Sequence, residues 1–350
     1  MRLFTLYRTS LLAFVLTAFA FSVTKAQDIH FSQFYMSNLT LNPAAAGAFK
    51  DVDVTANYRS QWGSITTNPY KTMAVAGDFR LHNKWKKGII ALGFNVFQDQ
   101  AGDGNLSTLQ ANLSLACHIK LDLHSMISAG LNGAFGQKSI NYNNLTWDNQ
   151  YVNGAFNAQN PSLEPTRGNS FFFPDFGAGV MYQYNRSEMY ISGNDKLHFD
   201  VGFSVAHFNQ PSIAFSNTAN ESLYMRYALI ANVLIGIKNT PLSIVPGMVF
   251  YRQGPTQEIQ AGSMLKYTLK EHSKYTGFIS SAALNVGAYY RWDDALVVTG
   301  LIELSSYSIG LSYDANLSKL LPATTARGGF EIALRYTNAS GYLYQHSHGF

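Results

Sequence analysis

The chain has 350 residues, of which 47% are hydrophobic, 14% aromatic and only 13% charged. Soluble domains carry about 25% charged residues, so this composition argues against an ordinary soluble domain. The net charge of +4 is too weak to predict nucleic-acid binding, and the single cysteine, Cys117, excludes an intrachain disulfide framework.

Residues 1–26 have the three parts of a secretory signal peptide. Arg2 and Arg8 precede an apolar run over residues 11–23, and "TKA" ends it with small residues. The alternative, a membrane anchor, requires a longer apolar run. We therefore expect cleavage near Ala26. No later run of about 18 apolar residues follows, and the β-barrel is the other fold that satisfies every backbone polar group in lipid.

The next stretch, "QDIHFSQFYMSNLTLNPAAAGAF", has neither a helical nor a strand period. It holds too many apolar side chains to leave in water, and its Asn-Pro step disfavours a helix. We expect residues 27–50 to form an N-terminal periplasmic or plug segment, which fills the barrel lumen, docks on a periplasmic partner or packs against the barrel wall. Its candidate contact residues are Phe31, Gln33, Phe34, Tyr35, Asn42 and Pro43.

From Asp51 onward, apolar and polar residues alternate with the period of a β-strand. We count about fourteen such segments of about ten to thirteen residues, near the length of tilted membrane-spanning strands. The predicted strands begin near residues 51, 70, 88, 107, 124, 174, 197, 223, 242, 257, 282, 295, 306 and 328. A soluble sandwich also alternates, but its strands are shorter, about 5–6 residues.

The pattern predicts an all-β fold, a transmembrane outer-membrane β-barrel of about 14 antiparallel strands over residues 51–337, followed by a tail over 338–350. An even strand count places both termini in the periplasm and the longest connection, about residues 136–173, outside.

The polar faces of the predicted strands carry bases and acids in nearly equal number. The bases are Arg59, Arg80, Arg226, Arg291 and Arg335, and the acids are Asp53, Asp78, Glu258, Asp293 and Glu331. A charge-selective pore would show a ring of one sign. Balanced charge predicts either a lumen that is cross-linked by ion pairs or filled by chain, or ordinary lumen polar groups with water between them.

No catalytic or cofactor motif is present. The chain lacks His-Glu-x-x-His, Gly-x-Ser-x-Gly and a phosphate loop, and the tail histidines at 346 and 348 have no third ligand nearby in the sequence. We therefore expect no enzymatic activity, no metal and no cofactor.

Seven stretches in order along the mature chain resemble the PorP/SprF family of type IX secretion system outer-membrane proteins. They are "FSQFYMSNLTLNPAAAG", "NYRSQW", "VGFSVAHFNQPS", "VPGMVFYRQGPTQEIQAG", "GAYYRWDDAL", "SIGLSYDANLSKL" and "GGFEIALRY". One departure is that "TNASGYLYQHSHGF" follows the last predicted strand, whereas such barrels end in an aromatic strand.

The resemblance implies a non-enzymatic outer-membrane component of the Bacteroidetes secretion and gliding machinery. Its implied partners are outer-membrane lipid, periplasmic type IX secretion components and a cognate secreted adhesin with a C-terminal sorting domain. The alternative is a passive outer-membrane channel for a hydrophobic or small solute, with the N-terminal segment as its plug.

Overall fold

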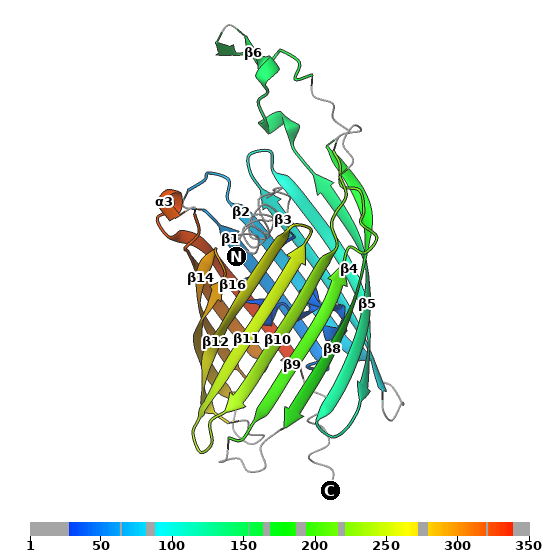
Figure 1. Cartoon of the computed structure of the whole chain (residues 1–350), viewed down its shortest axis with the longest axis vertical. Helices are drawn as coiled ribbons and strands as arrows, with labels where there is room; N and C mark the ends of the chain where they lie inside the picture. Colours follow the sequence, from blue (N-terminus) through cyan, green and yellow to red (C-terminus); the bar gives the residue numbers. More distant parts are fainter. Residues whose placement is uncertain are drawn as a thin grey trace, which may run out of the picture.

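The computed structural model describes residues 28–63, 65–81, 88–152, 154–163, 169–186, 194–215, 221–271, 279–319 and 321–338. Fourteen antiparallel strands form one closed barrel (Figure 1). The barrel closes because the first strand pairs with the last, with Val52 opposite Asn338 and Gln61 opposite Gly329. The predicted all-β barrel of about fourteen strands is confirmed. The predicted signal peptide and the tail beyond Asn338 lie outside the described residues.

The barrel strands run for 10 to 17 residues. They are β1 (Val52–Gln61), β2 (Tyr70–Leu81), β3 (Gly88–Ala101), β4 (Leu106–Lys120), β5 (Ser125–Ser139), β8 (Ser170–Arg186), β9 (Leu197–Ala206), β10 (Arg226–Gly236), β11 (Leu242–Gln253), β12 (Thr256–Lys270), β13 (Ala282–Arg291), β14 (Ala295–Leu304), β15 (Tyr307–Asn316) and β16 (Arg327–Asn338).

The remaining elements are short. They are η1 (Phe34–Met36), α2 (Asn38–Leu41), η2 (Pro43–Ala45), η3 (Tyr142–Asn144), η4 (Asp148–Gln150), β6 (Tyr151–Val152), β7 (Ala155–Phe156) and α3 (Leu321–Thr324). Among the described residues, no helix is long and apolar enough to cross a membrane.

The two-residue period of each strand separates a lipid face from a lumen face. In β4, the outward Leu113 and Leu115 are 63% and 52% exposed, whereas the inward Ser114 and His118 are 3% and 1% exposed. The core of the molecule is therefore inside the barrel, where polar wall residues meet the segment that precedes β1.

The two ends of the barrel differ. β5 and β8 are joined by residues 140–169, and the described part of this connection projects far beyond the strands and carries β6 and β7 (Figure 1). We call this connection the arm, its side of the barrel the arm end, and the opposite side the base. The arm is shorter than the predicted connection over 136–173, because β5 and β8 continue pairing up to Ser139 and Ser170. β1 begins and β16 ends at the base, since Val52 pairs with Asn338.

This arrangement predicts that the arm is exposed on the cell surface. In a Cys117→Ser background, we expect a cysteine at Asn160, in the arm, to react with an impermeant maleimide in intact cells. A cysteine at Asn239, in the β10–β11 turn at the base, should react only after the outer membrane is opened. The reverse preference would show that the base faces outward.

Candidate functional site: a plug bonded into the lumen

Residues 28–50, called the plug below, run through the lumen from the arm end to the base. The Asp28 amide donates to Oε1 of Gln253, the last residue of β11, over 2.9 Å at the arm end. The Gly47 amide donates to Oδ1 of Asp78, near the base end of β2, over 2.7 Å. The plug therefore lies inside the barrel along its length, in contact with the wall. The physical reason is that its polar groups find their partners on the lumen wall.

The local fold of the plug follows from its Asn-Pro step. Asn42 is extended, with φ −147°, and its side chain accepts a hydrogen bond from the Ala44 amide. Asn42 thereby caps η2, and Pro43 occupies the first helical position, where it needs no amide donor. The Asn42 Nδ2 donates to the Val180 carbonyl on β8 over 3.0 Å, which fixes this turn to the wall.

The aromatic residues of the plug pack into an apolar cluster within the lumen. Phe34 is fully buried and meets Tyr289 edge to face, with ring centroids 5.4 Å apart. Tyr35 stacks on the same ring at 5.8 Å, and its hydroxyl is 2.6 Å from the Thr299 Oγ1. Aromatic pairs of this kind each add about 0.5–1.5 kcal/mol beyond area burial.

The run of small residues after Asn42 lets the plug backbone touch the wall. A Cβ on Gly130 would lie 2.5 Å from the Ala44 amide nitrogen, and one on Gly179 would lie 2.0 Å from Asn42 Oδ1. These two glycines of the wall thus permit a close contact with the Asn42–Ala44 turn of the plug that a Cβ would prevent. Gly47, with φ +64°, then turns the chain towards β1.

Two lumen carboxylates, Asp314 and Glu331, accept hydrogen bonds from backbone amides and a serine hydroxyl of the plug. The Ser32 and Gln33 amides donate to Oε2 and Oε1 of Glu331 over 2.7 and 3.1 Å. The Ser32 hydroxyl donates to Asp314 over 2.7 Å. Asp314 and Glu331 are 3% and 1% exposed, so these charge-assisted bonds are sheltered from water.

Two buried arginines complete this network. Arg59 Nη2 and Arg291 Nη1 both donate to Asp314, over 2.8 and 3.1 Å. Arg291 Nη2 donates to the Ser32 hydroxyl over 2.6 Å, and Arg59 bonds the His30 carbonyl. We call Arg59, Arg291, Asp314, Glu331 and Ser32 the central network. Two cations here face two carboxylates, so the buried charges compensate one another.

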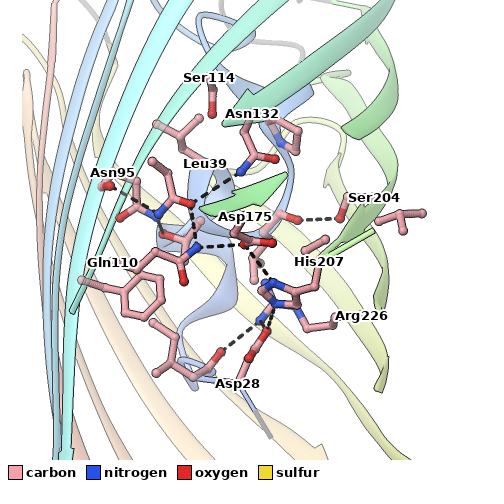
Figure 2. A pocket seen from close by; sticks show the side chains of 18 residues that line it. Asp28, Leu39, Asn95, Gln110, Ser114, Asn132, Asp175, Ser204, His207 and Arg226 are labelled. Atoms are coloured by element: carbon pink, nitrogen blue, oxygen red, sulfur yellow. Dashed lines mark hydrogen bonds and ion pairs between the residues drawn. The ribbon is translucent and has the colours of Figure 1, made fainter. Parts of the chain in front are cut away.

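A second group of charges holds the plug at the arm end (Figure 2). His207, just after β9, bonds Asp28 of the plug through Nε2 and Asp175 of β8 through Nδ1, the latter over 2.8 Å. Arg226 Nη1 lies 3.4 Å from the Asp28 carboxylate. Burial by itself lowers the pKa of His207, but the Asp28 carboxylate and the bonds to Asp175 raise it to about 9, so the ring is a cation at neutral pH.

Polar side chains of the wall surround a small cavity beside this histidine (Figure 2). The cavity has a volume of about 50 Å³ and lies between the plug and β3, β4, β5, β8 and β9. Gln110 Nε2 donates to Asp175 over 3.0 Å, and Asn112 links Gln110 to Asn132. This volume admits a few water molecules but no organic solute.

A third set of bonds fixes the plug near the base. Arg80 donates from Nε to the Gly47 carbonyl over 2.6 Å and from Nη1 to Asp51 over 2.8 Å. His118 Nε2 is 2.7 Å from the Ala46 carbonyl. The plug is thus bonded to the wall at both ends and in the middle.

The residues predicted from the sequence fall largely into this assembly. All six predicted contact residues are in the plug, with Phe31, Gln33, Phe34, Asn42 and Pro43 buried and Tyr35 half-buried. Arg59, Arg226, Glu258, Arg291 and Glu331 face the lumen, and Glu258 lies 3.4 Å from Arg291. The prediction for Asp293 is wrong. It sits in the exposed β13–β14 turn with φ +55°, and Asp294 instead pairs with Arg291 over 2.9 Å.

Sequence reasoning missed several partners of the plug. Asp314 follows the inward alternation of β15 and could have been read from that period. Ser32, Asp28 and His207 lie outside the strands, so the alternation of polar and apolar residues gives no signal for them. Asp175 lies in β8 but was not included among the predicted lumen acids.

Removing one cation of the central network should loosen the plug. Arg291→Met leaves the Asp314 and Glu258 carboxylates buried with one partner fewer, a change that costs about 3–5 kcal/mol for a buried pair. With Ser37→Cys as reporter in a Cys117→Ser background, we expect the thiol, 2% exposed in the native plug, to react with a small maleimide about tenfold faster or more.

The matched control is Arg252→Met, which removes an exposed arginine of β11. It should leave the rate unchanged. Heat-modifiable gel mobility should show that both barrels are folded. Equal labelling rates in the folded Arg291→Met variant and the native background would then contradict the claim that the central network holds the plug in place.

Among solved structures, the chain is similar to the CymD monoaromatic hydrocarbon channel (9% identity, 88% of this chain and 94% of that chain covered, TM-score 0.45). It is also similar to the translocator domain of the autotransporter NalP from Neisseria meningitidis (8% identity, 87% and 96% covered, TM-score 0.40). No curated protein matches the chain.

The family comparison covers nearly the whole described chain. The model of the type IX secretion system membrane protein PorP/SprF matches residues 23–336, which include the plug and every strand of the barrel except the last two residues of β16. The seven stretches that predicted this resemblance all lie within that range. With a plugged fourteen-strand barrel and this match, the chain belongs to the PorP/SprF family of type IX secretion system membrane proteins.

Proposed function

We propose that this protein is a sealed, non-enzymatic component of the type IX secretion system in the outer membrane. In this role it supports the export or surface attachment of a partner protein, such as a gliding adhesin with a C-terminal sorting domain. It cooperates with periplasmic components of the machinery. The observation that carries the proposal is the plug, together with the family to which the chain belongs.

The plug argues against the alternative of a passive channel. Its backbone and side chains bond to the wall near the arm end, in the middle and near the base. A solute would have to displace charge-assisted bonds and a buried aromatic cluster to pass. The cavity beside His207 holds only about 50 Å³, which is too small for a hydrophobic solute to cross at the arm end.

The use of the lumen charges supports a structural role over a catalytic one. A catalytic pair of carboxylates needs an open site where a substrate can lie against it. Here Asp314 and Glu331 accept bonds from Ser32 and Gln33 of the same chain. The central network therefore holds the plug in place.

The proposal is tested by deleting residues 29–45 of the plug. None of these residues belongs to a barrel strand, so the barrel should still close, and heat-modifiable gel mobility should be retained. We expect the purified variant to conduct in planar bilayers, where the intact protein gives little or no steady current. In cells, we expect the surface level of the type IX cargo to fall.

The matched control is the Asp293→Asn variant, which alters an exposed turn and should change neither readout. Large steady currents from the intact protein would favour the passive channel. Normal cargo display by a folded, conducting deletion variant would show that the plug seals the barrel but has no part in secretion.

A further inference from the structure

The lumen is hollow at its base, below the plug. This cavity, called the vestibule below, has a volume of about 480 Å³. Tyr35 and Phe49 of the plug and Val245 of β11 give it an apolar wall, and the ends of strands β8, β9 and β16 give it a polar one. It is large enough for several side chains, unlike the cavity beside His207.

Three of the basic side chains that line the vestibule are paired with acids. Lys266 Nζ lies 2.6 Å from Glu303, and Lys196 Nζ lies 3.3 Å from Glu271. The Arg335 guanidinium is bonded to Asp53. A charged ligand would have to break such a pair or bury an unpaired charge. The vestibule therefore favours an uncharged occupant with apolar side chains.

Polar groups of the wall point to a hydrogen-bond donor on that occupant. Gln183 of β8 is 1% exposed and lines the vestibule, yet its Oε1 has no hydrogen-bond partner among the described residues. The Nδ1 of His198, on the adjacent strand β9, also lacks one there. A buried acceptor that stays unpaired costs about 1–3 kcal/mol, which a donor from a ligand would recover.

The residues that follow β16 in the sequence have the properties expected of such an occupant, and β16 ends at the edge of the vestibule. β16 ends at Asn338, and Thr337 is itself part of the vestibule lining. Residues 339–350 read "ASGYLYQHSHGF", with no Asp, Glu, Lys or Arg, and with tyrosine, glutamine and histidine donors. Twelve residues extend for at most about 40 Å, so the segment can reach into the vestibule from the rim.

We propose that the vestibule is a peptide-binding site occupied by residues 339–350 of the same chain, with their aromatic side chains against the apolar wall and a side-chain donor bonded to Gln183. The tether makes such docking intramolecular, with an effective concentration on the order of 1 mM. The inference does not depend on the role in secretion.

The direct test is a disulfide between the vestibule and the tail. In a Cys117→Ser background of the full chain, Asn185→Cys on the vestibule wall is combined in turn with Ser340→Cys, Gln345→Cys and Ser347→Cys. Because a disulfide needs Cα atoms within about 7 Å, linkage reports close approach. We expect at least one pair to link in most molecules under mild oxidation, as seen by mass spectrometry of the purified, folded protein.

The control combines the same tail cysteines with Gln159→Cys, which is exposed on the arm. These pairs should not link. If all three vestibule pairs link no more than the arm pairs do, the proposal is wrong.

A second measurement uses a synthetic peptide of residues 339–350 and the protein that ends at Asn338. We expect saturable binding by fluorescence anisotropy with a dissociation constant below about 1 mM, the effective concentration of the tether. Asn232→Trp, inside the vestibule, should weaken binding about tenfold by occupying space, whereas Asn209→Trp, exposed at the arm end, should not. Binding that Asn232→Trp leaves unchanged would place the tail elsewhere and overturn the proposal.

Discussion

A buried charge must have a partner, and in this lumen the partners lie on the chain's own N-terminal segment. Arg59 and Arg291 enter from opposite sides of the β1–β16 closure and meet at Asp314, and Ser32 of the plug bonds both Asp314 and Arg291. Without the plug, these groups would need water as their hydrogen-bond partner. Glu331 would also lose the two hydrogen bonds that it accepts from the Ser32 and Gln33 amides. The wall and the plug therefore form one hydrogen-bonded unit.

The same constraint explains why the opening stretch of the chain looks irregular. A segment that crosses a narrow lumen meets a different strand every few residues, so it cannot keep the period of a helix or a strand. Aromatic rings occupy the part that faces the Tyr289 cluster, and Asn42, Pro43 and Ala44 occupy the part that lies against Gly130 and Gly179. In both parts, the composition of the plug fits the wall that it touches.

The barrel was predictable from the sequence because each strand repeats one physical rule. Alternation placed most strand starts within a few residues, including 70, 88 and 197, where β2, β3 and β9 begin. It also placed Arg59 and Glu331 in the lumen. The rule fails at strand ends. After β13, Asp293 is exposed to solvent, and the next residue, Asp294, forms the ion pair with Arg291.

The path of the plug could not be read from the sequence, because its contacts join residues far apart in the chain. Ser32 and Asp314 are 282 positions apart, and Asp28 and His207 are 179 apart. No local pattern encodes such a pairing. Only the closed barrel, once formed, brings the last strands beside the segment that precedes the first.

Hydrogen–deuterium exchange of the plug amides tests this account most directly. The folded protein in detergent micelles would be exchanged at neutral pH and digested, and the peptides covering Ser32, Gln33 and Gly47 would be followed over time. Because these amides donate to Glu331 and Asp78 inside the barrel, they should stay protected as long as those of the neighbouring strands. Exchange within seconds, at the rate of an unstructured peptide, would contradict the claim that plug and barrel form one unit.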